Sequence, residues 1–231
     1  MKKFFFVILC LSVYSLFAQS KDANKILDGV KQKFAKINDY QVDVNIKVDV
    51  NFIKMPDRKA KLFFKQPNKT KFQADGFAML PKQGFSFSPV QLLKDDYSAI
   101  YVCNEVIDGK KLDVIKIVPN NDTSDVVLST LWIDQSINAM SKVETVGKKS
   151  GNIIIDFKYA GNNNSLPYEV KFSFNAGGDS PIPAIPEKDK NNTNNMKQMG
   201  RGPIKGSAIL TYTNYKINQG IPDSFFVEKK K

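Results

Sequence analysis

Thirteen consecutive residues alternate between apolar and polar side chains, and this segment limits the possible folds more than any other part of the sequence. Every second residue from Tyr40 to Phe52 is apolar, and each residue between them is polar or charged. A period of two is that of a β-strand with one buried and one solvated face. Strands usually run about five or six residues, so this one predicts a large curved sheet or a barrel.

Further alternating runs, separated by turn residues, predict an antiparallel, mainly β domain. Pro67-Asn68 separates two of them, and Asp108-Gly109 is typical of a two-residue hairpin turn. Before the sheet, an apolar stripe at helical spacing predicts one amphipathic helix from Asp22, its N-cap, to Ile37. A short apolar segment from Ser224 to Val227 closes the domain. The expected strands are 40–52, 61–66, 69–75, 99–105, 111–118, 126–133, 142–146, 152–159, 168–175 and 205–217.

Two segments lack a clean period. Residues 76–96 are apolar but irregular, and Ser88-Pro89 could open a short helix through Leu93 that serves as a lid. Residues 177–203 are rich in Pro, Asn and Gly, which predicts a flexible insertion loop.

The N-terminus reads as a secretory signal. Lys2 and Lys3 precede an apolar run from Phe4 to Phe17 that is shorter than a membrane span, and Ala18 is a small residue suited to cleavage. We therefore expect a signal peptide at 1–18, a single domain at 19–231 and a periplasmic location. The alternatives are an uncleaved anchor and a lipid anchor at Cys10, for which the preceding apolar run is very short.

The composition argues against catalysis. The chain has no histidine, which removes Ser–His–Asp and Cys–His chemistry and nearly all zinc sites. The carboxylate pairs Asp95-Asp96 and Asp122/Asp125 lie in turns, where Asp is common for backbone reasons. The polar run 120–125 lacks the Gly and Glu of an EF-hand loop. We expect no enzyme activity, no cofactor and no metal, although a carboxylate-based hydrolase remains the minor alternative.

The charge is basic but carried by lysine. The formal net charge is +11, and Arg58 and Arg201 are the only arginines. Proteins that recognise nucleic acid rely on the guanidinium groups of arginine, so we expect no nucleic-acid partner. Solubility, or attraction to an anionic membrane surface, fits this charge better.

An alternating sheet of this size must cover its apolar face. The helix and the 76–96 segment could fill that face completely and leave a solid core, or cover it loosely and leave an apolar cleft. In the second case the candidate lipid-binding residues are those on the apolar face of the first strands and in the irregular segment: Val42, Val44, Ile46, Val48, Leu62, Phe64, Phe72, Phe77, Leu80, Phe85 and Phe87.

The order of these features resembles the LolA-like family of lipoprotein-sorting carriers, with relatives such as LppX and the N-terminal domain of RseB. The resemblance spans Asp22 to Val227. It rests on the leading helix, the long first strand, and the segments KLFFKQPNKTKF at 61–72, Leu131-Trp132-Ile133-Asp134, Leu166-Pro167 and Ile221-Pro222-Asp223-Ser224-Phe225.

The resemblance implies an unclosed antiparallel half-barrel with a helical lid. It also implies a hydrophobic cavity for the acyl chains of a lipid or lipoprotein, an inner-membrane donor protein and an outer-membrane acceptor protein, and a monomer. In the family an Arg before the Pro-Asn pair helps to hold the lid; here that lid-latch position is Gln66. The alternative function is an interaction or stress-sensor module of the cell envelope that uses the same fold without transporting lipid.

Overall fold

The described part of the chain forms one long antiparallel sheet with one α-helix lying across it. The structure, a computed structural model, describes residues 21–50, 53–54, 56–73, 93, 96–148, 151–161, 166–176 and 204–227. Its elements are α1 (Ala23–Ala35), β1 (Asp39–Val50), β2 (Ile53–Lys54), β3 (Arg58–Lys65), β4 (Lys69–Gln73), β5 (Tyr97–Ile107), β6 (Lys110–Pro119), β7 (Val126–Asp134), β8 (Ala139–Gly147), β9 (Gly151–Lys158), β10 (Glu169–Ala176), β11 (Ile204–Ile217) and the 3-10 helix η2 (Asp223–Phe226).

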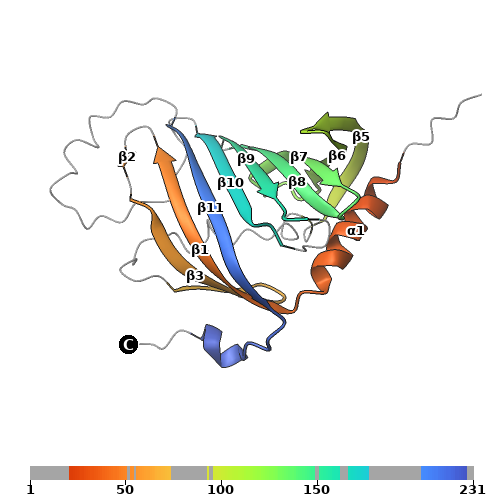
Figure 1. The fold of residues 1–231 in the computed structure, drawn as a ribbon. Helices are drawn as coiled ribbons and strands as arrows, with labels where there is room; N and C mark the ends of the chain where they lie inside the picture. The colour runs from red at the N-terminus through yellow and green to blue at the C-terminus, as the bar shows by residue number, and fades with distance from the viewer. Residues whose placement is uncertain are drawn as a thin grey trace, which may run out of the picture.

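The strand order brings the first and last strands of the domain together. It runs β4-β3-β1-β11-β10-β9-β8-β7-β6-β5, with β2 paired to β1. Because β4 and β5 lie at opposite ends of this path and do not pair, the sheet stays open as a half-barrel (Figure 1). The predicted unclosed, mainly β fold is confirmed, as is the three-strand meander β1-β3-β4.

The register places the alternating apolar residues of neighbouring strands on one face. Directly paired residues share a face, and Val44 pairs with Tyr212, Val42 with Leu62, and Leu62 with Phe72. The same face continues through the pairs Val170–Leu210, Phe157–Val170, Val143–Ile155, Leu131–Val143 and Ile115–Leu131. The concave side is therefore one apolar surface from β4 to β6.

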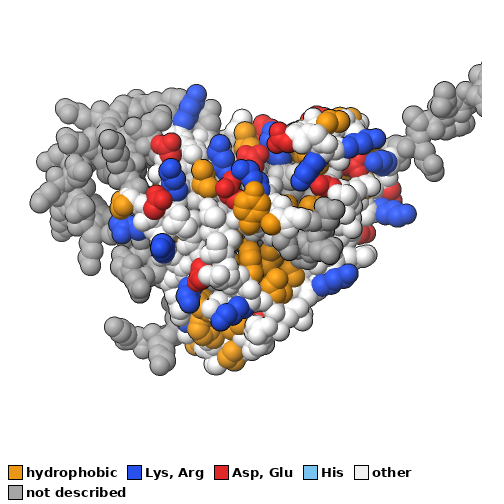
Figure 2. All heavy atoms as spheres, in the orientation of Figure 1, with side chains coloured by type: hydrophobic (Ala, Val, Ile, Leu, Met, Phe, Trp, Pro, Cys, Tyr) orange, Lys and Arg blue, Asp and Glu red, His pale blue; other side chains and the backbone are white. Residues whose placement is uncertain are grey.

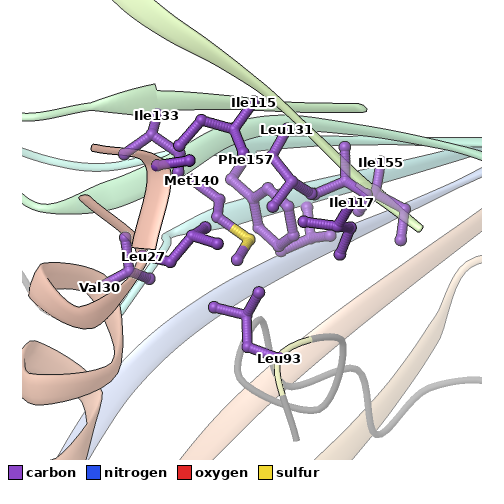
Figure 3. Packing of buried hydrophobic residues seen from close by; sticks show 13 residues of the cluster. Leu27, Val30, Leu93, Ile115, Ile117, Leu131, Ile133, Met140, Ile155 and Phe157 are labelled. Atoms are coloured by element: carbon purple, nitrogen blue, oxygen red, sulfur yellow. The ribbon is translucent and has the colours of Figure 1, made fainter. Parts of the chain in front are cut away.

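The helix covers only the β5–β8 side of this surface. Asp22 caps it as predicted, since its carboxylate accepts hydrogen bonds from the Asn24 and Lys25 amides at 2.9 and 3.3 Å. Figure 3 shows Leu27 and Val30 of α1 meeting Met140 and the neighbouring residues of the sheet. Leu27 and Met140 are completely buried, so this half of the concave side is a filled core.

Several boundaries differ from the sequence prediction. β3 begins at Arg58, because its first residues pair with the long β1, which extends the strand beyond the predicted start at Lys61. Ser224 to Phe226 belong to a 3-10 helix. Of the predicted lid only Leu93 is described, and it is buried in the core cluster. The candidates Phe77, Leu80, Phe85 and Phe87, the segment 1–20 and the 177–203 loop lie outside the described residues.

A polar junction ties the start of β1 to the end of β11. Asp39 is 3 % exposed, and its carboxylate accepts hydrogen bonds from the backbone amides of Gln219 (2.9 Å) and Gly220 (3.0 Å). The Asn218 side chain accepts from the Asn38 amide at 2.7 Å and donates to the Lys36 carbonyl at 2.9 Å. The Asp39 junction, as we call it, consists of Asn38, Asp39, Asn218, Gln219 and Gly220. It holds the turn between α1 and β1 against the residues that follow β11.

Replacing Asp39 by Ala should lower the free energy of unfolding by about 1–3 kcal/mol, because two backbone amides lose the buried carboxylate that accepts from them. Asp49→Ala, on the exposed face of the same strand, is the matched control and should change stability by less than about 0.5 kcal/mol. Urea unfolding of both variants measures the difference. Equal effects at the two positions would show that the junction contributes nothing specific.

Candidate functional site

The concave side over β10, β11, β1, β3 and β4 carries one cluster of apolar side chains. Its buried members are small and aliphatic: Val42, Val44, Ile46, Ala60, Leu62, Ala208 and Leu210. The residues packed against them are only half-buried: Tyr40, Val48, Phe72, Phe172, Tyr212 and Tyr215. We call these two sets together the apolar wall.

The helix distinguishes the apolar wall from the core beneath α1, because it supplies buried residues such as Leu27 and Val30 to that core and none to the wall. On the α1 side, Ile115, Leu131, Ile133, Met140 and Val143 are all 0 % exposed, and partly buried residues, Tyr97 and Tyr101 among them, pack against them. On the wall, rings and a valine keep accessible surface although they lie on the concave side of the sheet. Figure 2 shows hydrophobic side chains gathered in the middle of the molecule with lysines spread around them. Apolar surface that stays accessible in this way is a candidate binding surface.

Seven of the predicted lipid-binding residues lie on this wall or at its edge. Val42, Val44, Ile46, Leu62 and Phe64 are buried, and Val48 and Phe72 are half-buried. The structure thus brings together residues that are up to thirty positions apart in sequence onto one face, as the alternating pattern predicted. The half-buried members can meet a ligand directly, whereas the buried ones support them. That these residues contact lipid remains a prediction.

Sequence reasoning missed the contribution of β11. Tyr212 and Tyr215 are three residues apart, so a regular strand would point them to opposite faces. The pairing of β1 with β11 shifts register between Gln41 and Asp43, and Asn214 has φ 57°. This β-bulge turns both tyrosines to the concave side. The signal that could have found it is the asparagine, which tolerates a positive φ better than most residues.

A separate hollow of about 470 Å³ lies at the rim of the half-barrel. It is bounded by the β5–β6 turn, the β7–β8 turn and the end of β9, and it is lined by Lys110, Lys111, Asp134, Gln135, Ser136, Ile137, Tyr159 and Gly161. Its lining mixes charged and apolar side chains, which suits an acyl chain poorly. The apolar wall, not this hollow, is therefore the candidate functional site.

Comparison with solved structures identifies the fold. A LolA superfamily protein from Nitrosomonas europaea superposes with a TM-score of 0.58 at 14 % identity, covering 90 % of this chain and 99 % of that one. The chain has a LolA-like fold. A DUF1329 family protein from Desulfovibrio piger gives 0.58 at 11 % identity over 89 % and 97 % of the two chains. An outer membrane lipoprotein-sorting protein domain from Vibrio parahaemolyticus gives 0.51 at 12 % identity, over 89 % and 97 %.

The LolA-like resemblance stated from sequence is thus confirmed at the level of the fold. Neither a family model nor a curated protein sequence matches this chain. No helix in the described part of the chain is both long and apolar enough to span a membrane. The described ranges also hold no group of three or more acidic, Cys or His side chains that could bind a metal ion.

Gln66, which the resemblance to the LolA-like family implies as a lid-latch position, lies against the end of α1. The Gln66 side-chain amide donates to the Ile37 carbonyl at 2.7 Å, and it reaches the Ala35 and Phe34 carbonyls at 3.3 and 3.4 Å. Phe34 and Ala35 form the last turn of α1, and Ile37 follows the helix directly. The Phe34 ring also meets the Phe64 ring at 5.6 Å. Gln66 therefore ties the helix to the β3–β4 turn.

Replacing Gln66 by Ala should lower the free energy of unfolding by about 0.5–1.5 kcal/mol, the usual contribution of a hydrogen bond. Amide hydrogen exchange should speed up at the C-terminal turn of α1, because the helix end loses its tie to the sheet. Gln73→Ala, at an exposed position of β4, is the control and should leave that exchange unchanged. Identical exchange in both variants would contradict the tie.

The outer face of β3 and β4 holds the C-terminal 3-10 helix. Asp223 accepts from Lys65 and Lys69, each at 2.7 Å, and the Phe225 ring lies 4.6 Å from the Phe63 ring. The Lys71 ammonium lies 4.4 Å from the centre of the Phe225 ring. Hydrogen bonds from Lys65 and Lys69 lower the pKa of Asp223 to about 2.

The attachment of this 3-10 helix should weaken as the pH falls. Because the folded-state pKa of Asp223 is lowered from 3.8 to about 2, its contribution is complete above pH 3.8 and is lost as the pH falls through about 2. NMR titration of the Asp223 carboxyl, with amide exchange at Phe225, measures this. Asp223→Asn should abolish the pH dependence in that window. An Asp223 pKa at its ordinary value would contradict the two-lysine contact.

Proposed function

We propose that this chain is an exported carrier that binds the acyl chains of a lipid or lipoprotein on its concave apolar wall. The observation that carries the proposal is the set of half-buried side chains on that wall, because an apolar surface left accessible inside an open half-barrel gains free energy when hydrocarbon covers it. The LolA-like fold supports the proposal, since one structure of similar fold is a lipoprotein-sorting domain.

The magnitude of the effect is adequate for a carrier. Burial of one methylene contributes about 0.8 kcal/mol, so a dozen methylenes supply on the order of 10 kcal/mol. Association and ordering costs of several kcal/mol offset part of this. The remainder suits a complex that forms readily and can still pass its ligand to a protein with a better cavity.

Within the proposal, the N-terminal segment and the net charge of the chain both suit transfer between membranes. Within the proposal, residues 1–18 act as the signal peptide that delivers the chain to the periplasm. Of the formal net charge of +11, Lys2 and Lys3 in the signal peptide carry +2, so about +9, mainly from lysines, remains and attracts the exported chain to anionic lipid surfaces. A donor protein at the inner membrane and an acceptor at the outer membrane would load and unload it.

Replacing Val48 by Asp should reduce the affinity for a fluorescent long-chain acyl probe about tenfold or more, because the acyl chain would bury an ionised carboxylate. Lys47→Asp introduces the same group one residue away, on the exposed face of β1, and should leave affinity within about twofold. Fluorescence titration measures both, and thermal unfolding confirms that both variants are folded.

Equal probe affinity in the two Asp variants would place the acyl site elsewhere. Native mass spectrometry of the gently extracted protein provides an independent test, because a carrier should retain lipid. A lipid-free protein that captures one protein partner would instead support the envelope interaction module.

A further inference from the structure

A row of aromatic rings crosses the apolar wall. It starts at Phe64, which stacks on Tyr40 at 5.1 Å between ring centres. Tyr40 meets Tyr215 edge-on at 5.9 Å, and Tyr215 stacks on Tyr212 at 6.1 Å. The row therefore sets three phenol groups into a surface whose other members are apolar.

The three hydroxyls differ in how they are satisfied. The Tyr215 hydroxyl donates to the Pro167 carbonyl at 2.7 Å. Among the described residues, the Tyr40 and Tyr212 hydroxyls have no hydrogen-bond partner, and every fully enclosed side-chain polar atom there has one. The two hydroxyls are therefore not fully enclosed: each keeps some accessible surface.

The environment of these hydroxyls is apolar, although neither is fully enclosed. Removal from water raises the pKa of Tyr40 and of Tyr212 far above the ordinary value. Both phenols are consequently neutral at any physiological pH and offer O–H donors. A donor in such surroundings without an acceptor is costly, and most buried donors in folded proteins have one.

The apolar surroundings of the aromatic row favour an uncharged hydrogen-bond acceptor. Lys47 and Lys216 lie on β1 and β11 but are exposed and out of register with the row, so no described cation belongs to it. A carboxylate or phosphate taken into apolar surroundings needs a counter-charge, whereas a carbonyl oxygen needs only a donor.

We infer that Tyr40 and Tyr212 form a subsite for the carbonyl oxygens of ester- or amide-linked acyl chains. The inference rests on the proposed function, because it assumes that acyl chains occupy the wall. It narrows the ligand class: acylated glycerol, as in glycerolipids and the lipid part of lipoproteins, binds in preference to free fatty acids or plain hydrocarbon.

The test compares two matched probes, dioctanoylglycerol and the corresponding dioctyl glycerol diether, which lacks both carbonyl oxygens. Wild-type protein should bind the ester several-fold more tightly. Tyr40→Phe and Tyr212→Phe should each weaken ester binding about threefold to tenfold, as expected for one hydrogen bond, and leave ether binding within twofold. Competition with an environment-sensitive fluorescent acyl probe measures all the affinities.

Tyr215→Phe is the matched control in the same row. Its hydroxyl is already satisfied by Pro167, so this variant should lower the melting temperature and leave the ester-to-ether ratio unchanged. Tyr40→Phe and Tyr212→Phe should not lower the melting temperature of the ligand-free protein, because each removes a hydroxyl without a partner.

Each outcome is informative. A wild-type protein that binds ester and ether equally, or Phe variants that weaken both probes alike, would overturn the carbonyl subsite while leaving the acyl carrier intact. Failure of the wild-type protein to bind either probe would overturn the carrier and the subsite together.

Discussion

One apolar face shared by ten hydrogen-bonded strands is the constraint on which the rest of this structure depends. Antiparallel pairing puts every second residue on that face, so its area grows with each strand, while the described part of the chain offers one thirteen-residue helix to lie against it. The helix covers the side formed by β5 to β8 and adds its own residues to the core there. The opposite side receives no buried residue from α1 and keeps rings that are half-buried, which is why we propose it as the ligand-binding surface.

The polar contacts concentrate where the helix meets the sheet. The Asp39 junction joins the start of β1 to the residues after β11, and Gln66 donates to the carbonyl of Ile37, just after α1. On the outer face, Lys65 and Lys69 hold Asp223. These contacts fasten one end of the half-barrel from both sides.

The tyrosines add chemistry to a surface that hydrophobicity alone would leave unselective. Hydrocarbon binds any apolar wall, and its burial distinguishes poorly between one acyl compound and another. Two neutral donors in the aromatic row add direction, because they favour a carbonyl oxygen at a defined depth. A carrier built in this way would gain most of its affinity from burial and most of its selectivity from Tyr40 and Tyr212.

Local sequence pattern determined the elements of this protein. The alternation from Tyr40 to Phe52 requires a long half-buried strand, Asp22 caps the helix that precedes it, and Asp108-Gly109 turns a hairpin, with Asp108 and Gly109 both at positive φ. Each of these depends on residues close in sequence, so the pattern suffices. It also placed Val42, Val44 and Leu62 on one face, because the period of a strand is two.

Only the tertiary structure decided which part of that face lies beneath α1 and which part does not. The pairing of β1 with β11 joins segments more than 150 residues apart, and the bulge at Asn214 that turns Tyr212 and Tyr215 inward exists only in that pairing. The contacts of Gln66 with α1 likewise join residues about thirty positions apart. Register and long-range contact depend on how distant strands meet, and no local period encodes that.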